Sequence, residues 1–470
     1  MLMQAKLIWE GWMKSRGWGT ASAYVIALLL GASLGGLVLF VPPLYLALGL
    51  GGLIFAYLLF FQIELAVILA LLVLEFLRDY NYLGGGTPFH PNGLMGLALI
   101  FGVIWYFAFN KIDYARLPAI KYFTGFLVAS FISLLFSGDH LMEGLTITLR
   151  LASGLAIYAV LVYKTDSIRK VIRVVAVILI ALVLPTASGL VMIARGEGDK
   201  FLQMDTARLG GGTSGPGVYL AMLLILCVVF FLNARTNPKR ILWGSLCALF
   251  AVGLYFSYGR AGWIGFAAGL FFIGFLKYKK LLIILPGFLI VALLLLPEIS
   301  TRFSDISLGQ LGNRDSSTFA MRIELWRAGW DVFKANNPLF GVGYGVERYR
   351  VGEYLERYAW TPHNDYVGML VCTGLVGLTI FLLWHGQWFF DLFRVYRSSK
   401  FEFDQTLSLA VLAMFFVSLV VRLSDNIVQS TGRMYPLAAL VAVTLILPRI
   451  RAEEAEKKML AHSRRSINLK

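Results

Sequence analysis

The 470-residue sequence has little charge and few of the side chains that usually bind metals. Charged residues make up 15% of it and hydrophobic residues 58%, with only five histidines and three cysteines. A soluble chain with so little charge could not cover its surface with polar groups. The cysteines lie in apolar segments without ligand spacing, and no His, Cys, Asp and Glu cluster has the spacing of a metal site. The sequence therefore predicts neither a soluble protein nor a metal or other cofactor.

Long apolar runs take the place of charge. Runs of roughly 17–25 apolar residues cross a bilayer as helices, because a helix satisfies its own backbone in lipid. We therefore predict an all-α polytopic membrane protein with about 12–14 transmembrane helices and one large, partly helical extracytoplasmic loop. The predicted spans are 21–41, 43–60, 62–77, 94–109, 121–136, 144–162, 174–193, 215–232, 241–257, 262–276, 281–296, 365–384, 405–421 and 435–449.

Positive charge sets the predicted orientation of these spans. Most of the 42 Lys and Arg residues lie at the termini and in alternate connections, which the positive-inside rule assigns to the cytoplasm. The net charge of +15 is thus explained by topology and anionic lipid, and nucleic-acid binding is not predicted. The predicted division is a cytoplasmic N-terminus (1–20), a helix bundle (21–296), a large periplasmic loop (297–364), C-terminal transmembrane helices (365–449) and a basic cytoplasmic tail (450–470).

The large outer loop, residues 297–364, contains its own helix signals. One helix is predicted over 317–333, and Pro338 with the glycine-rich segment 341–345 breaks it. A second helix is predicted over 351–358. The glycine run lacks the preceding strand and the spacing of a nucleotide-binding fingerprint. We therefore interpret it as a turn.

One histidine lies where this loop returns to an apolar helix, in Thr361-Pro362-His363-Asn364-Asp365. Ionisable groups at a membrane boundary are costly and are often functional. A histidine pKa of about 6.5 suits a base or proton acceptor near neutral pH. The alternative is that His363 only starts the helix, with Asn364 and Asp365 as ordinary N-cap residues. The residues alone leave both interpretations open.

Four arginines are candidates for binding an anion. Arg208 precedes a glycine-rich loop and a helix start, a combination that suits phosphate. Arg260 follows Tyr258 in a tight outer turn, Arg322 lies on the outer-loop helix, and Arg150 lies within a span and needs a partner or a snorkelling route to water. The alternatives are a flexible turn for Arg208, a snorkelling anchor for Arg260 and a solvated helix face for Arg322.

Three outer segments share the order and spacing of one known family. They are His363-Asn364 followed after nine residues by Gly374, the stretches Arg322–Trp326 and Asn337–Gly343 before that histidine, and the hairpin Ser257–Trp263. Arg208 also precedes the hairpin as a loop arginine does in that family. Together these segments resemble the bacterial O-antigen ligase and O-antigen polymerase superfamily. The hairpin departs from the family in having Tyr and Gly between its Ser and Arg.

The resemblance implies a glycosyltransferase of the bacterial inner membrane with a periplasmic active site and cytoplasmic termini. Its donor would be a glycan on undecaprenyl diphosphate, and its acceptor a hydroxyl of a lipid or glycan such as lipid A-core, in lipopolysaccharide biosynthesis. Arg208 and Arg260 would hold the diphosphate, and His363 would accept the proton in an inverting transfer without metal or other cofactor. Further candidates for substrate binding are Arg322, Arg150, Asn364, Asp365 and Tyr258.

The sequence leaves three functions open. We prefer a ligase that moves a finished glycan, because the sequence has a large outer loop and a single small set of candidate arginines with His363. A polymerase for O-antigen or exopolysaccharide would join two undecaprenyl-diphosphate-linked units and needs the same residues. A transporter for a lipid-linked glycan would instead place ionisable groups near mid-membrane. Most candidates here lie towards the outer face, which favours an enzyme.

Overall fold

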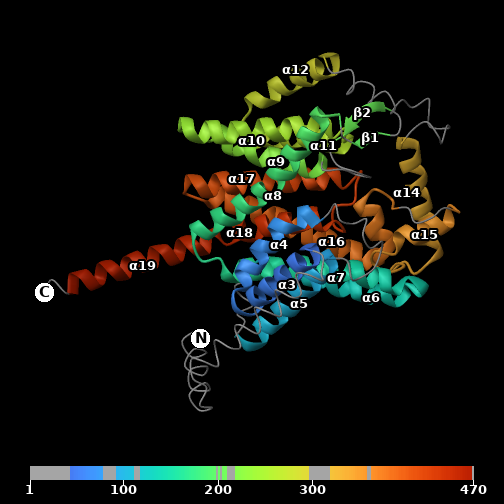
Figure 1. The fold of residues 1–470 in the computed structure, drawn as a ribbon, viewed down its shortest axis with the longest axis horizontal. Helices are drawn as coiled ribbons and strands as arrows, with labels where there is room; N and C mark the ends of the chain where they lie inside the picture. Colours follow the sequence, from blue (N-terminus) through green and yellow to red (C-terminus); the bar gives the residue numbers. More distant parts are fainter. Residues whose placement is uncertain are drawn as a thin grey trace, which may run out of the picture. The chain divides into compact units, whose positions relative to one another are not determined.

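The computed structural model describes residues 43–77, 91–110, 117–196, 199–201, 204–208, 217–295, 318–356 and 361–467. These residues are almost entirely helical, and the protein is an all-α polytopic membrane protein, as predicted (Figure 1). The chain divides into two units, residues 1–61 and 62–470. The first contains helix α3 (Pro43–Phe61), and all other described elements belong to the second.

The second unit consists of consecutive helices with one short hairpin. The helices are α4 (Ile63–Leu77), α5 (Pro91–Phe109), α6 (Ile120–Ser133), α7 (Leu141–Lys164), α8 (Ile168–Ala194), α9 (Gly217–Leu232), α10 (Asn237–Phe256), α11 (Arg260–Leu276), α12 (Lys280–Leu295), α14 (Thr318–Ala335), α15 (Glu347–Tyr354), α16 (Asp365–Ser398), α17 (Glu402–Val421), α18 (Thr431–Leu445) and α19 (Leu447–Ile467). Two 3-10 turns, η3 (Leu134–Phe136) and η4 (Gly138–His140), join α6 to α7. The antiparallel strands β1 (Asp199–Phe201) and β2 (Met204–Arg208) follow α8.

The predicted spans agree with this helix order. Thirteen of the fourteen coincide with helices, and the remaining one, 21–41, lies outside the described residues. Within the described chain, six helical segments are long and apolar enough to cross a membrane, and shorter apolar helices accompany them. The apolar runs and their lengths therefore predicted the helix positions well, because a segment in lipid must form its backbone hydrogen bonds within itself.

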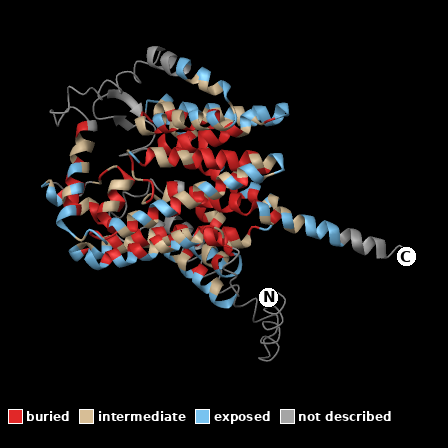
Figure 2. Ribbon diagram, turned by 180° about the vertical axis from the view of Figure 1, so that it is seen from behind, coloured by how far each residue is buried: buried red, intermediate tan, exposed pale blue. Residues whose placement is uncertain are grey.

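The core of the bundle surrounds α9, which packs against α10, α11 and α17. Every residue of α9 from Gly217 to Cys227 is buried, as expected of a helix that is apolar on all sides. The centre of the bundle is buried, whereas its outer helices and the projecting α19 expose more of their residues (Figure 2). A second set of contacts joins α16 to α6 and α17, and α18 to α7.

Helix α16 is interrupted at Gly374, whose φ of 64° and ψ of −165° are not helical. The carbonyls of Val371 and Cys372 accept hydrogen bonds from the N–H groups of residues 342 and 343, both at 3.0 Å. The N–H groups of residues 375 and 376 donate to the carbonyls of residues 338 and 339 at 2.9 and 3.1 Å. The segment 338–343 therefore satisfies the backbone groups that the break releases.

Two glycines permit this close approach. A Cβ at Gly341 would overlap the carbonyl of Val371, and one at Gly374 would overlap the backbone of Leu339. Both residues also have positive φ, which side chains other than glycine rarely adopt. The glycine-rich segment is a turn, as predicted, and the structure adds that it braces the break in α16.

The two helices of the outer loop pack on the first half of α16. Helix α14 contributes Leu325, Ala328 and Val332 to a buried cluster that includes Val351 of α15 and Val371 of α16. The start of α14 agrees with the predicted 317–333. The second helix, predicted over 351–358, is present as α15 but starts four residues earlier and spans 347–354, so the predicted bounds were wrong. The turn ends with the positive φ of the glycine at 345, which lets the helix start earlier, and the left-handed residue 356 then ends it.

Candidate functional site

His363 lies on the short segment between α14 and the start of α16. The indole Nε1 of Trp326 on α14 donates to the carbonyl of Pro362 at 2.9 Å, which ties the segment to the outer loop. His363 is half-buried and has a φ of 48°, a left-handed conformation that costs energy for residues other than glycine. Such strain often occurs at functional sites, where the surrounding structure fixes the residue.

The two residues after His363 have local structural partners. The side-chain oxygen of Asn364 accepts hydrogen bonds from the N–H groups of Tyr366 and Val367 at 2.9 and 3.1 Å. Asn364 is therefore the N-cap of α16, one of the two roles that the sequence left open.

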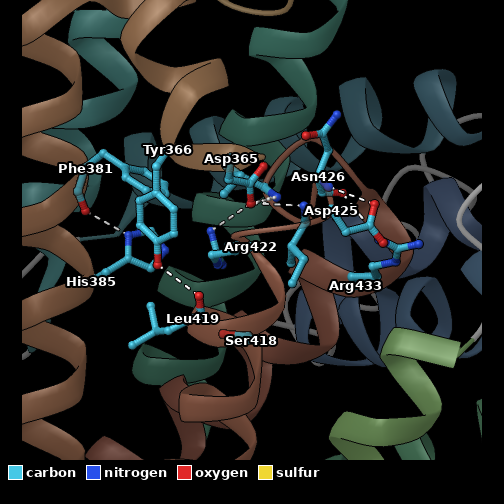
Figure 3. A network of polar contacts seen from close by, with 12 residues as sticks. Asp365, Tyr366, Phe381, His385, Ser418, Leu419, Arg422, Asp425, Asn426 and Arg433 are labelled. Atoms are coloured by element: carbon cyan, nitrogen blue, oxygen red, sulfur yellow. Dashed lines mark hydrogen bonds and ion pairs between the residues drawn. The ribbon is translucent and has the colours of Figure 1, made fainter. Parts of the chain in front are cut away.

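Asp365 is buried in an ion pair with Arg422, the residue that ends α17 (Figure 3). Their closest N–O distance is 3.3 Å, and the same Asp365 oxygen accepts hydrogen bonds from the N–H groups of Ile427 and Val428 at 3.0 and 3.2 Å. The N–H of Asp365 donates to the carbonyl of Arg422 at 2.9 Å. These bonds fasten the loop 422–430 to the start of α16.

That loop brings a further charged pair close to His363. Asp425 and Arg433 are joined at 2.8 Å, and Asp425 also accepts a hydrogen bond from the N–H of Asn426 at 2.8 Å (Figure 3). Both residues are largely buried. Sequence reasoning missed this pair, although the predicted outward position of 422–434 and its mixture of charges could have indicated it.

The charges around His363 favour its neutral form. Burial lowers the pKa of His363, and the nearby Arg322 and Arg433 lower it further, while Asp425 opposes them. A neutral imidazole is the form that accepts a proton. The site therefore presents a base that is available at neutral pH.

Arg322 and Arg260 bring two guanidinium groups to the same site. Burial lowers the pKa of Arg322, and the nearby charge of Arg260 lowers it further, while Asp425 opposes the effect. Arg322 is half-buried on α14, and Arg260 is the first residue of α11. Arg322 therefore lies within electrostatic range of both Arg260 and His363, which the sequence singled out in three separate segments. Two such cations near each other favour a bound anion.

The remaining candidates lie in different settings. Arg208 is the last residue of β2, opposite Asp199, and its side chain and the following residues 209–216 lie outside the described structure. Tyr258 forms the turn between α10 and α11 with a φ of 50°, and it is buried next to Tyr255. Arg150 on α7 lies within electrostatic range of Arg348 and Tyr435.

Within the described part of the chain, no three His, Cys, Asp or Glu side chains gather in an arrangement that could hold a metal ion.

Comparison with known families gives this site a context. Residues 245–382 match the family described as O-antigen ligase, and this segment contains Arg260, Arg322, His363 and Gly374. This match supports the resemblance to the O-antigen ligase and polymerase superfamily over that segment of the chain. No curated protein matches the chain. The family indicates a membrane glycosyltransferase-like enzyme of surface polysaccharide biosynthesis, with lipid-linked glycan substrates.

Proposed function

We propose that the protein is an O-antigen ligase-like glycosyltransferase that moves a glycan from undecaprenyl diphosphate to an acceptor hydroxyl. The observation that carries this proposal is the convergence of Arg260, Arg322 and His363 from three segments. Two cations suit a diphosphate, and a neutral histidine beside them suits the removal of a proton. The acceptor is lipid A-core or a similar lipid or glycan, and the site faces the periplasm.

The reaction is a direct displacement at the anomeric carbon. His363 accepts the proton of the acceptor hydroxyl as its oxygen forms a bond to that carbon. The bond from the carbon to the diphosphate oxygen breaks, and undecaprenyl diphosphate leaves with the electron pair. Attack from the opposite side inverts the anomeric centre. Arg260 and Arg322, with Arg208, stabilise the charge that develops on the leaving group, a contribution that is commonly large in enzymes.

The loop 422–430 supports this chemistry indirectly. Asp425 holds Arg433 and places a negative charge near both His363 and Arg322. The Asp365–Arg422 pair fixes this loop to the helix that His363 precedes. We therefore treat Asp365 as a positioning residue and not as a ligand of the substrate.

The polymerase is the second candidate, and one observation favours it. A polymerase needs a second lipid-linked diphosphate as acceptor, and a second arginine, Arg348, lies within electrostatic range of Arg150. The donor chemistry at His363 is the same in both enzymes, so only the acceptor distinguishes them.

A reconstituted transfer assay tests the proposal. Purified full-length protein receives a single-repeat undecaprenyl-diphosphate glycan with EDTA and no ATP, with and without lipid A-core. Glycan on the added core supports the ligase, whereas a ladder of longer polyprenyl-linked products without core supports the polymerase. Transfer that stops with EDTA contradicts the metal-independent mechanism. Movement of the intact lipid-linked glycan across liposomes, with neither product formed, replaces both enzymes by a transporter.

A further inference from the structure

The part of the outer loop that braces α16, segment 338–343, carries exposed apolar side chains. Leu339 is 52% exposed, and the ring of Phe340 stacks on that of Phe136 with centroids 5.9 Å apart and planes 4° apart. Phe136 and its neighbour Leu135, which is 81% exposed, end the apolar run of α6 and η3. The outer loop therefore meets the end of a membrane helix through apolar side chains on both sides.

Leu375, on the far side of the break in α16, extends this surface. It is exposed, and its N–H donates to the carbonyl of Pro338 at 2.9 Å. We call the combined surface the apolar edge, and it consists of Leu135, Phe136, Leu339, Phe340 and Leu375. The sequence has no charged residue from 122 to 138 or from 335 to 346. Exposed apolar patches of this kind usually mark contact with a protein or a membrane.

The length of α6 and η3 indicates the depth of the edge. From Lys121, on the predicted cytoplasmic side, to Phe136 the helical path rises about 24 Å. The hydrocarbon core of a bilayer is about 30 Å thick. Phe136, together with the ring of Phe340 that stacks on it, therefore lies within the outer part of the core.

The second half of α16, which packs along α6, gives the same depth independently. Asp391 and Arg394 form an ion pair at 2.6 Å towards the predicted cytoplasmic end of this helix. Gly374 lies seventeen residues before Asp391, about 26 Å along the helix axis. The break, and the four backbone hydrogen bonds that join it to segment 338–343, thus lie in the outer hydrocarbon layer. Non-helical backbone at that depth needs partners within the protein, which these bonds supply.

The edge is continuous with a surface of α6 that faces outwards from the bundle. Val128, Ile132 and Leu135 are all exposed, and their spacing places them on one face of the helix. Because α6 belongs to the membrane-spanning part of the chain, this stripe faces lipid. The lipid that covers the stripe reaches the edge without a change of surface chemistry.

We propose that segment 338–343 re-enters the membrane and that the apolar edge contacts the acyl chains of the outer leaflet. The partner is the bilayer itself, as the continuity with the stripe on α6 requires. The predicted periplasmic loop 297–364 then contains one segment at membrane depth. Since this segment is bound to the break in α16, it also fixes the depth of the first half of α16 and of His363, which precedes it.

Spin labels on the full-length protein in liposomes test this depth. The nitroxide on Leu339→Cys should collide readily with oxygen, which concentrates in lipid, and rarely with the water-soluble complex Ni-EDDA. Its ratio of oxygen to nickel accessibility should match that of Val128→Cys on the lipid-facing stripe. The ratio should be several-fold higher than that of Arg195→Cys, because Arg195 is exposed at the end of α8, a helix of 27 residues that is longer than the core is thick. The unaltered protein, labelled in the same way, gives the background of its own three cysteines.

Two further variants and three outcomes make the test decisive. Leu135→Cys and Leu375→Cys repeat the measurement at other points of the edge, so that the result does not depend on one variant. Nickel accessibility equal to that of Arg195→Cys would place the edge in water and overturn the proposal. Protection from both reagents would mean that a second copy or another part of this chain covers the edge, which also overturns it. A lipid-exposed label in a protein without transfer activity would leave the re-entrant segment standing while the proposed function fails.

Discussion

Two charged regions lie near the start of α16, and they differ in how their charge is balanced. Asp365 and Arg422 are buried as a pair, and Asp365 is also bound by two backbone N–H groups. Around His363, the nearby cations are Arg322 and Arg433 and the nearby anion is Asp425. The first region is a buried pair of opposite charges, whereas in the second two cations and one anion act on a histidine.

This difference distinguishes charged residues that stabilise the fold, such as Asp365 and Arg422, from charged residues that we propose to bind substrate. A buried pair resists the loss of either partner, because the remaining charge would have no compensation. A site where several arginines lie near one another attracts an incoming anion. The comparison therefore predicts that changes at Asp365 affect stability, while changes at Arg260, Arg322 and His363 affect activity.

The largest expected effect is that of removing the base. His363→Asn should lower the rate of transfer by roughly 10²–10⁴-fold, the usual range for general base catalysis. Asparagine tolerates the left-handed backbone at this position, so the unfolding temperature should not change. His363→Ala should abolish transfer in the same way. Rates come from the reconstituted assay, and normal turnover by well-folded variants would show that His363 is not the base.

Removing Asp365 should have the next largest effect, on stability. Asp365→Ala leaves Arg422 buried without its carboxylate and should cost about 3–5 kcal/mol. Asp365→Asn retains an acceptor for the N–H groups of Ile427 and Val428 and should cost less. Thermal unfolding followed by tryptophan fluorescence measures both, with Asp139→Ala as a control because Asp139 is exposed. A stable Asp365→Ala protein with weakened donor binding would instead make Asp365 a substrate ligand.

Most helices could be predicted from the sequence, because apolar runs, caps and helix breaks are local sequence features. Apolar runs gave the positions of α4 to α12, and helix α14 was predicted from a cap and a break. The hydrogen bonds between segment 338–343 and the interrupted α16 were not predictable, because a glycine-rich sequence does not indicate which other backbone segment it contacts. The start of α15 was misplaced for a related reason, since it depends on the conformation of that turn.

Residues of the candidate site could be predicted from the sequence only where the residue type or its local position is unusual. His363 is conspicuous because histidine is rare in this chain, and Arg260 because it lies in a tight turn. Arg422, in contrast, resembles an ordinary arginine at the end of a span, and its partner Asp365 is 57 residues away. Asp425 was missed because its importance depends on a loop that folds back onto α16. Such pairs follow from tertiary contacts, which local patterns do not contain.

A smaller effect is expected from the arginines of the site. Arg260→Gln and Arg322→Gln should each raise the KM for the donor by roughly 10–100-fold, since each removes charge-assisted hydrogen bonds to phosphate. Arg327→Gln is the matched control, because Arg327 lies on the same helix as Arg322 but is exposed. Equal effects of Arg322→Gln and Arg327→Gln would mean that the site attracts the donor only through its net charge.

The smallest expected effect is a shift in pH dependence, and its direction differs between two variants. Transfer requires neutral His363, so kcat/KM should fall as pH decreases through the pKa of His363, which lies below its usual value of about 6.5. Arg322→Gln removes a cation that disfavours protonation, so this pKa should rise and the acid limb should move to higher pH. Asp425→Asn removes the anion that favours protonation, so the limb should move to lower pH. Profiles of both variants, with Arg327→Gln unchanged as the reference, measure the two shifts. Shifts in the same direction would show that the limb reports a group other than His363.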